Sequence, residues 1–164
     1  ELKEDLRGRL GEVKEEMARE ETRSLVLNAL VDAVTVDPPD KLVEEEFQHR
    51  LQHFEEELKR AGVTMDEYGR RAQLTELEIR RDIRQQVVRS IKAELILEEV
   101  ARRAEIDVTQ DEIGQEIAMA AVRSGRDAKE VAEQVLSSGR LGTVAADIMR
   151  RKALDHVAEN ATLR

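Results

Sequence analysis

The sequence of 164 residues contains no cysteine and no tryptophan, and its aromatic side chains are limited to two phenylalanines and one tyrosine. The absence of cysteine excludes disulfides, thiolate metal sites and a cysteine nucleophile. With so few aromatic residues, apolar surface has to come from Leu, Val, Ile, Ala and Met arranged in stripes. Narrow stripes of this kind favour extended helices over a compact ball.

Long apolar runs are also missing. No segment approaches the roughly 20 apolar residues that a membrane-spanning helix needs, and no basic-then-apolar leader is found. The formal net charge of −9 should repel nucleic acid and anionic lipid. Basic clusters such as Arg150-Arg151-Lys152 are diluted by nearby acids and are predicted to be solvated helix faces. We therefore expect a soluble protein that contacts neither nucleic acid nor membrane directly.

The residue types that perform catalysis are scattered. His49 and His53 have the spacing of a two-histidine metal site but lack the H-E-x-x-H pattern, which favours exposed histidines on a solvated face. The glutamates at 44–46 and 55–57 fan around a helix and should stay hydrated, which does not suit acid–base catalysis. The segment 139–142 lacks the G-K-[ST] ending of a phosphate loop. The sequence predicts no enzyme activity, no metal and no cofactor.

Helix-start signals are the clearest motifs. Three S/T-x-x-E capping boxes begin at Thr64, Thr75 and Thr109. In such a box the threonine hydroxyl accepts a hydrogen bond from the third helical amide, and the glutamate accepts one from the amide of the cap residue. No segment reads as a convincing strand. The predicted fold class is all-α.

We expect one elongated, multi-helix domain over residues 1–164. Its arm-forming helices cover about 1–61 and 109–160, and a long central helix covers about 75–104. Two small helical subdomains are the alternative, because a chain of this length can bury one sizeable core or two small ones.

A helix break is expected at residues 34–39. Proline lacks an amide donor and pushes the residue before it out of the helical region. Asp37 is expected to cap the following helix, with Pro38 or Pro39 in its first turn. That helix should end before Gly62.

Two segments carry a resemblance to a known family. The first, V-D-P-P-D-K-L-V-E-E-E at 36–46, follows a long charged helix, and the second, I-D-V-T-Q-D-E-I at 106–113, follows the long helix from Arg80 to Ala101. In this order they resemble the C-terminal domain of bacterial trigger factor, over almost the whole chain. The resemblance implies an all-helical body with two arms that form a cradle. The peptide-binding body of a periplasmic chaperone of the SurA type is related in shape.

The resemblance also implies a function. Members of the family are ATP-independent chaperones that hold unfolded or nascent polypeptides. Ribosome docking and peptidyl-prolyl isomerase activity belong to other domains of the family, and neither a docking loop nor a β-rich isomerase domain is found in this sequence. For this sequence the resemblance therefore implies only the holding of client chains. Contact with the ribosome is expected only through such other domains.

The apolar side of the helix that follows Pro39 is the first candidate for client contact. It bears Phe47, Leu51 and Phe54, and looser candidates are Tyr68, Met119 and Met149. Exposed apolar side chains rimmed by charge would suit transient capture of a client. The alternative, which the sequence leaves open, is that these side chains only hold the helices together.

A rival function comes from the first helix. Leu6, Leu10, Val13 and Met17 keep the 4-3 spacing of a seam that packs on a neighbouring helix. Such a seam would suit an assembly module that docks on one folded partner or on a second copy. Self-association as a homodimer therefore stays open.

Overall fold

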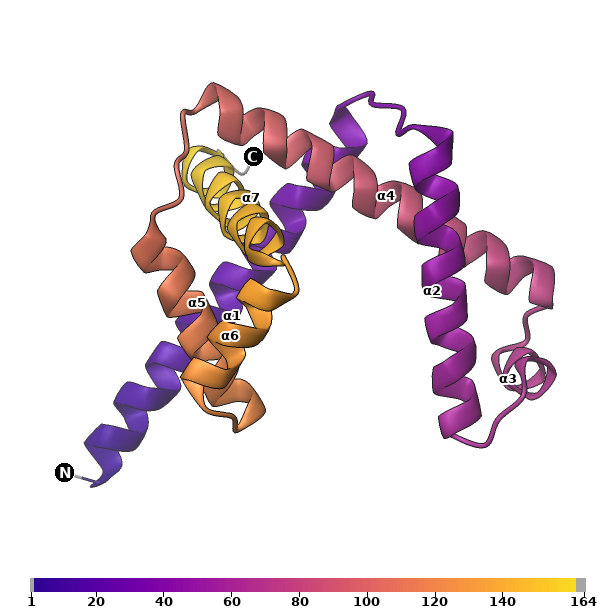
Figure 1. Cartoon of the computed structure of the whole chain (residues 1–164), viewed down its shortest axis with the longest axis horizontal. Coiled ribbons are helices and arrows are strands. Elements are labelled where there is room, and N and C mark those ends of the chain that lie inside the picture. The colour runs from indigo at the N-terminus through magenta and orange to yellow at the C-terminus, as the bar shows by residue number, and fades with distance from the viewer. Residues whose placement is uncertain (1, 162–164) are drawn as a thin grey trace. The chain divides into compact units, whose positions relative to one another are not determined.

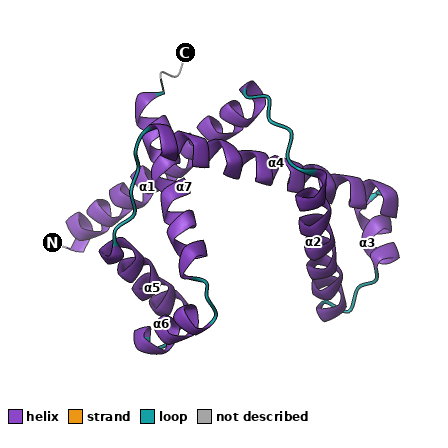
Figure 2. Cartoon of the chain, turned by 45° about the horizontal axis from the view of Figure 1, so that its top comes forward, coloured by secondary structure: helices purple, strands orange, loops and turns teal. Residues whose placement is uncertain are grey.

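The computed structural model describes residues 2–161, with side chains at residue 11 and from residue 13 onward. These residues form seven helices and no strand (Figure 2). The helices are α1 (Leu2–Ala33), α2 (Asp40–Arg60), α3 (Met65–Ala72), α4 (Glu76–Arg103), α5 (Gln110–Ser124), α6 (Ala128–Ser137) and α7 (Leu141–Asn160). The all-α fold class predicted from the sequence is confirmed.

The predicted capping boxes are present at α3, α4 and α5. At α5 the Glu112 amide donates to the Thr109 hydroxyl (3.2 Å), and the Thr109 amide donates to the Glu112 carboxylate (2.7 Å). The Thr64 and Thr75 boxes have the same reciprocal hydrogen bonds. Each box satisfies amides that a helix leaves unpaired at its start, and so fixes where these three helices begin.

The start of α2 differs from the prediction. Asp37 does not cap the helix; Pro39 occupies the N-cap position, and α2 begins at Asp40 without a side-chain cap. Asp37 and Pro38 each precede a proline and are therefore disfavoured in the helical region, which leaves Pro39 as the first residue that can end the extended link. The Pro39 carbonyl then accepts the first helical hydrogen bond, from the Val43 amide (3.1 Å).

The chain divides into two compact units. Unit 1 consists of Glu1–Leu30 and Leu97–Arg164, and unit 2 of Val31–Ile96. Helices α1 and α4 contribute residues to both units, whereas the other helices each belong to one. The single domain with helical arms that we expected from the sequence stays a prediction.

Unit 2 is held together by an apolar core between α2 and α4. Its buried members are Val43, Phe47, Leu51, Val87 and Ile91. Those from α2 recur every four residues and those from α4 are four apart, so each set lies on one face of its helix. At the edge of this core, Arg84 Nη1 donates to Glu44 Oε2 (2.6 Å), and Arg84 Cζ lies over the Phe47 ring, 5.5 Å from its centre.

Helix α3 closes the far end of unit 2 through a tight turn. Gln73 adopts the left-handed conformation, and the Leu74 amide donates to the Gly69 carbonyl (2.9 Å). Gly69 is buried, and a Cβ atom at this position would lie 2.6 Å from the Leu74 carbonyl oxygen. Glycine is therefore required here by the close approach of two backbone segments.

Replacing Gly69 with alanine is expected to lower the free energy of unfolding by about 1–3 kcal/mol, because the added methyl group displaces backbone rather than a flexible side chain. Gly114→Ala is the matched control: Gly114 lies inside α5 with nothing near its Cβ position. There the same change should stabilise the chain by about 0.5–1 kcal/mol through helix propensity. Urea denaturation followed by circular dichroism measures both, and equal shifts of the two midpoints would contradict the packing argument.

The main core of unit 1 brings α1, α4 and α7 together. Leu97, Ala101 and Ala153 are buried in it, and Leu27, Leu30 and Met149 are among the side chains that pack around them. The two alanines, one each from α4 and α7, are almost completely buried, and their small side chains allow a close approach of these helices. Helix α5 packs against both α6 and α7 (Figure 1).

Candidate functional site

The described residues contain no group of three or more potential ligands that could hold a metal ion. His49 and His53 are exposed on α2, and Glu57 Oε1 lies 3.6 Å from His53 Nδ1. None of the described helices combines the length and the hydropathy needed to cross a membrane.

The structure places two of the client-contact candidates in the core of unit 2. Phe47 is 8% exposed and Leu51 is also buried, and both pack against α4. Their main role in the structure is to hold α2 on α4, which is the alternative that the sequence left open. Client contact by either side chain stays a prediction, and it would require α2 to move away from α4.

The other four candidates do not form one site. Phe54 and Tyr68 are half-buried and pack edge to face, with ring centres 5.1 Å apart, and so join α2 to α3. Met149 packs against the core of unit 1. Met119 is the one candidate that presents a large apolar side chain to solvent, with 48% of it exposed.

The exposed apolar surface lies mainly on residues other than the predicted client contacts. Ten large apolar side chains of the described residues are exposed. Four of them are Leu25, Leu42, Leu136 and Leu141, and the other six form three pairs: Val13 with Met17 on α1, Leu74 with Leu77 around the start of α4, and Met119 with Val122 on α5. We call these the three exposed pairs. In the α1 and α5 pairs the members are three or four residues apart and so share a helix face.

The Leu74–Leu77 and Met119–Val122 pairs stand near helix ends. Leu77 is 78% exposed in the first turn of α4, and Val122 is 83% exposed in the last turn of α5. The sequence contains a signal for the exposure of both pairs, because they lie next to residues that mark helix ends, the Thr75 capping box and Gly125. Side chains in the terminal turns of a helix have fewer neighbours to pack against, which leaves apolar residues there open to solvent.

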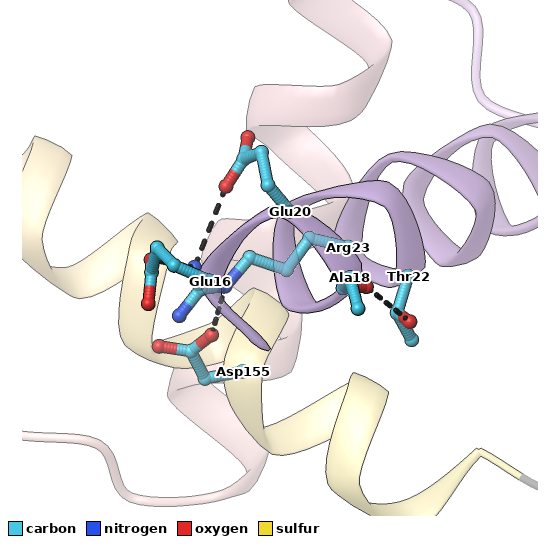
Figure 3. A network of polar contacts seen from close by, with 6 residues as sticks. All are labelled: Glu16, Ala18, Glu20, Thr22, Arg23 and Asp155. Carbon is cyan, nitrogen blue, oxygen red and sulfur yellow. Dashed lines mark hydrogen bonds and ion pairs between the residues drawn. The ribbon is translucent and has the colours of Figure 1, made fainter. Parts of the chain in front are cut away.

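A polar network joins α1 to α7 in unit 1 (Figure 3). Arg23 Nε donates to Asp155 Oδ1 (2.5 Å), and Arg23 Nη1 donates to Glu20 Oε2 (3.4 Å). Glu16 lies 3.6 Å away on the same side of α1. The hydrogen bond that Arg23 donates to Asp155, together with the negative charge of that carboxylate, raises the pKa of Arg23 above its usual value. The network fixes the contact between two helices and contains no arrangement of acid, base and nucleophile.

A second network joins α7 to the start of α5. It corrects part of the prediction that the basic cluster at 150–152 is a solvated face, since Arg150 and Lys152 are half-buried whereas Arg151 is exposed. Lys152 Nζ donates to the Asp107 carbonyl (2.6 Å) and to Glu112 (2.7 Å). Arg151 lies 2.8 Å from Glu116, and Arg150 donates to Glu98 (3.0 Å). The sequence could not show these partners, because they lie 35 to 52 positions away along the chain and only the fold brings them close.

The contact with Lys152 lowers the pKa of Glu112 to about 2, with further contributions from the Thr109 amide and hydroxyl. Since the pKa is lower in the folded state than in the unfolded state, the stabilisation is present above the ordinary glutamate pKa near 4.5 and is lost as the pH falls toward 2. Glu112→Gln keeps an acceptor for the capping box but removes the charge.

We expect Glu112→Gln to lose less stability than the parent chain between about pH 5 and pH 2. Urea denaturation curves at intervals across this range measure the difference. Exposed glutamates that pair within one helix, such as Glu99 with Arg102, titrate alike in both proteins and cancel. Parallel stability curves for the two proteins would show that the charge of Glu112 contributes nothing.

Comparisons with known proteins agree along the chain. The family model described as bacterial trigger factor protein C-terminus matches residues 1–159. The trigger factor of Carboxydothermus hydrogenoformans is 34% identical to this chain over 98% of the chain, and that of Salinispora arenicola is 32% identical over 100% of it. The chain spans 37% of the length of each of these relatives. A solved structure of trigger factor domains from Thermotoga maritima matches with a TM-score of 0.68 at 21% identity, over 87% of this chain and 83% of that one.

Proposed function

Because the chain belongs to the family of the bacterial trigger factor C-terminus, we propose that it is a chaperone domain that holds unfolded or nascent polypeptides without ATP. The observation that carries this proposal is the exposed apolar surface on both units. Surfaces of this kind bind exposed apolar segments of other chains, and a folded client has already buried such segments.

Binding through the three exposed pairs would be weak at each point. A covered apolar side chain contributes on the order of 1 kcal/mol, so affinity comes from several contacts made together. Weak contacts also dissociate quickly, and a client that buries its own apolar residues no longer rebinds. Release then needs no nucleotide, which agrees with the lack of a phosphate-binding motif in the sequence.

The remaining functional expectations are part of the same proposal. The domain acts in the cytoplasm, without a cofactor and without catalysing a reaction. Ribosome contact and prolyl isomerisation are assigned to regions of the family's proteins that this chain, at 37% of their length, does not span.

The proposal is tested with a chemically denatured reporter enzyme diluted into buffer that contains the purified chain. Light scattering should fall as the ratio of chain to reporter rises, and adding ATP should not change the curve. Gly114→Ala, which is expected to preserve the surface, serves as a control for the preparation. Scattering that is the same with and without the chain at every ratio would contradict the proposal.

An assembly module is the second candidate, and the exposure of Val13 and Met17 supports it. Met17 is 68% exposed on α1, and Val13 lies one turn before it. A seam of this kind can be covered by a second copy. Sedimentation over a concentration series separates the two functions: tight self-association that Val13→Glu abolishes, together with unchanged aggregation of the reporter, supports assembly.

A further inference from the structure

Helices α5 and α6 form a hairpin that lies outside the apolar core of unit 1. The two helices pack side by side (Figure 2). The described members of that core come from α1, α4, α7 and the link after α4, and none of them belongs to α5 or α6. Two links without helical structure, residues 104–109 and 138–140, join the hairpin to the rest of unit 1. The hairpin can therefore move without taking a side chain out of the core.

Polar contacts with α7 hold the start of the hairpin in place. Lys152 Nζ donates to a backbone carbonyl of the link before α5 (2.6 Å) and to Glu112 Oε1 (2.7 Å). Arg151 Nη1 lies 2.8 Å from Glu116 Oε2, a buried oxygen, while Arg123 of the same helix donates to Glu116 Oε1 (3.0 Å). Two cations of α7 thus face two carboxylates of α5. We call the pairs Lys152–Glu112 and Arg151–Glu116 the ionic latch.

A buried apolar side chain lies on the face of α7 that carries the latch. Ile148 is 2% exposed and stands one turn before Arg151 and Lys152, so it shares their face of the helix. Ile148 is not among the residues of the core between α1, α4 and α7. The hairpin therefore covers an apolar position of α7 as well as two cations.

The latch is weaker than the core of unit 1. Ion pairs that stay in contact with water contribute little net free energy, because each charge gives up hydration when the pair forms. Arg151 is exposed and Lys152 is half-buried, so water and dissolved ions reach the latch. An element attached by such contacts opens more readily than an element within an apolar core. The hairpin therefore needs less free energy to open than the core needs to unfold.

We propose that the α5–α6 hairpin is a strap that opens away from α7 when the ionic latch breaks, and that opening uncovers the face around Ile148 for an unfolded client. Short links at the ends of helices absorb the backbone rotation that such an opening requires, and the hairpin has one at each end. Salt then regulates how much apolar surface the chain offers. The opening is a property of the chain alone, and only the use of the uncovered face rests on the proposed function.

Hydrogen exchange of the full chain tests the opening in sodium chloride at about 0.1 M and about 1 M, between which the Debye length falls from about 10 Å to about 3 Å. Exchange in α5 and α6 should become about fivefold faster at the higher salt, which corresponds to about 1 kcal/mol. Exchange in α4 should change much less. Equal acceleration in all helices of unit 1 would show that the hairpin unfolds with the core, and this result, like no acceleration in α5 and α6, would overturn the proposal.

The double variant Arg151→Gln/Lys152→Gln should reproduce the fast exchange of the hairpin at low salt, with little further effect of salt. The capping box at the start of α5 remains, because the variant changes only α7. Arg102→Gln/Arg103→Gln is the matched control: it removes the same charge from two exposed arginines that pair with Glu99 within α4. Equal exchange of the hairpin in variant and control would overturn the latch.

Cysteine labelling tests the uncovered face itself, because the chain has no cysteine of its own. Ile148→Cys should react with a maleimide about fivefold faster at the higher salt. Ala153→Cys is the control, since Ala153 is fully buried in the core and should react slowly at both salt concentrations. Equal salt dependence of the two positions would overturn the proposal, and the exchange experiment on the unchanged chain gives the reading if either cysteine disturbs the fold.

The outcomes also separate this inference from the proposed function. Arg151→Gln/Lys152→Gln should suppress aggregation of the reporter at a lower concentration than its control does, and equal suppression would overturn the use of the face by clients. If the chain suppresses aggregation but the hairpin stays closed, the strap fails and the chaperone proposal stands. If the hairpin opens but the chain does not suppress aggregation, the chaperone proposal fails while the opening stands.

Discussion

Phe47→Ala is expected to lower the free energy of unfolding by about 3–5 kcal/mol, the cost of removing a large buried side chain and leaving a cavity. Phe47 is 8% exposed and packs in the cluster that joins α2 to α4. It also holds the Arg84 guanidinium over its ring. Phe47 lies at the centre of the core that holds α2 on α4, so its loss is expected to loosen α2 and, with it, α3.

Thermal denaturation followed by circular dichroism measures the change in stability, and hydrogen exchange locates it. Exchange should rise in α2 and α3. Leu77→Ala is the control, because a side chain that is 78% exposed contributes little to the folded state. If Phe47→Ala keeps full stability and instead loses the ability to suppress aggregation, Phe47 is a client contact rather than a core residue.

Glutamine at Leu74, Leu77, Met119 and Val122 together is expected to raise the concentration of chain needed to suppress aggregation by about tenfold. A tenfold change corresponds to a loss of about 1.4 kcal/mol of binding free energy, which several weak apolar contacts supply together. Glutamine has a helix propensity close to that of leucine and methionine, so the helices should persist. Light scattering of a diluted, denatured reporter enzyme measures the effect, with circular dichroism as a check on the fold.

The control for this variant changes the same number of exposed polar residues. Glu21, Lys59, Lys129 and Glu133 are all exposed, and glutamine at these four positions leaves the net charge unchanged. This control should suppress aggregation as well as the parent chain. Equal suppression by the four-residue apolar variant and by the control would show that the exposed pairs do not hold clients.

Local features of this fold follow from the sequence because they depend on neighbours along the chain. The Thr64, Thr75 and Thr109 boxes each need only a glutamate three residues later, and all three form as predicted. Asp127 likewise caps α6 through hydrogen bonds from the Lys129 and Glu130 amides. The error at Asp37 is also local, because two successive prolines move the start of α2 to Asp40.

Exposure could not be predicted in the same way. Phe47 and Leu77 are both apolar residues on amphipathic helices, yet the first is buried and the second is open to solvent. The difference depends on which helix covers each face. Val87 and Ile91, which cover the face of α2 that carries Phe47, lie about 40 residues further along the chain. Apolar spacing shows that a face will be covered but not what covers it.

The polar contacts show the same difference between partners nearby in the sequence and partners that only the fold brings close. Arg80 and Glu76 pair within one turn of α4, as their spacing indicates. Lys152 pairs instead with Glu112, 40 residues earlier, and lowers its pKa to about 2. A cluster of like charges in the sequence therefore predicts a solvated face, although each member has a partner from another part of the fold or from a neighbouring turn.

Site-specific photocrosslinking to an unfolded client tests the central claim most directly. The chain has no cysteine, so single cysteines introduced at Leu77, Val122 and Glu133 can each carry a photoreactive label without background. With the denatured reporter present, we predict crosslinks to the client from positions 77 and 122 and few from position 133. Crosslinks of equal yield at all three positions, or crosslinks only between copies of the chain, would contradict capture of clients by the exposed pairs.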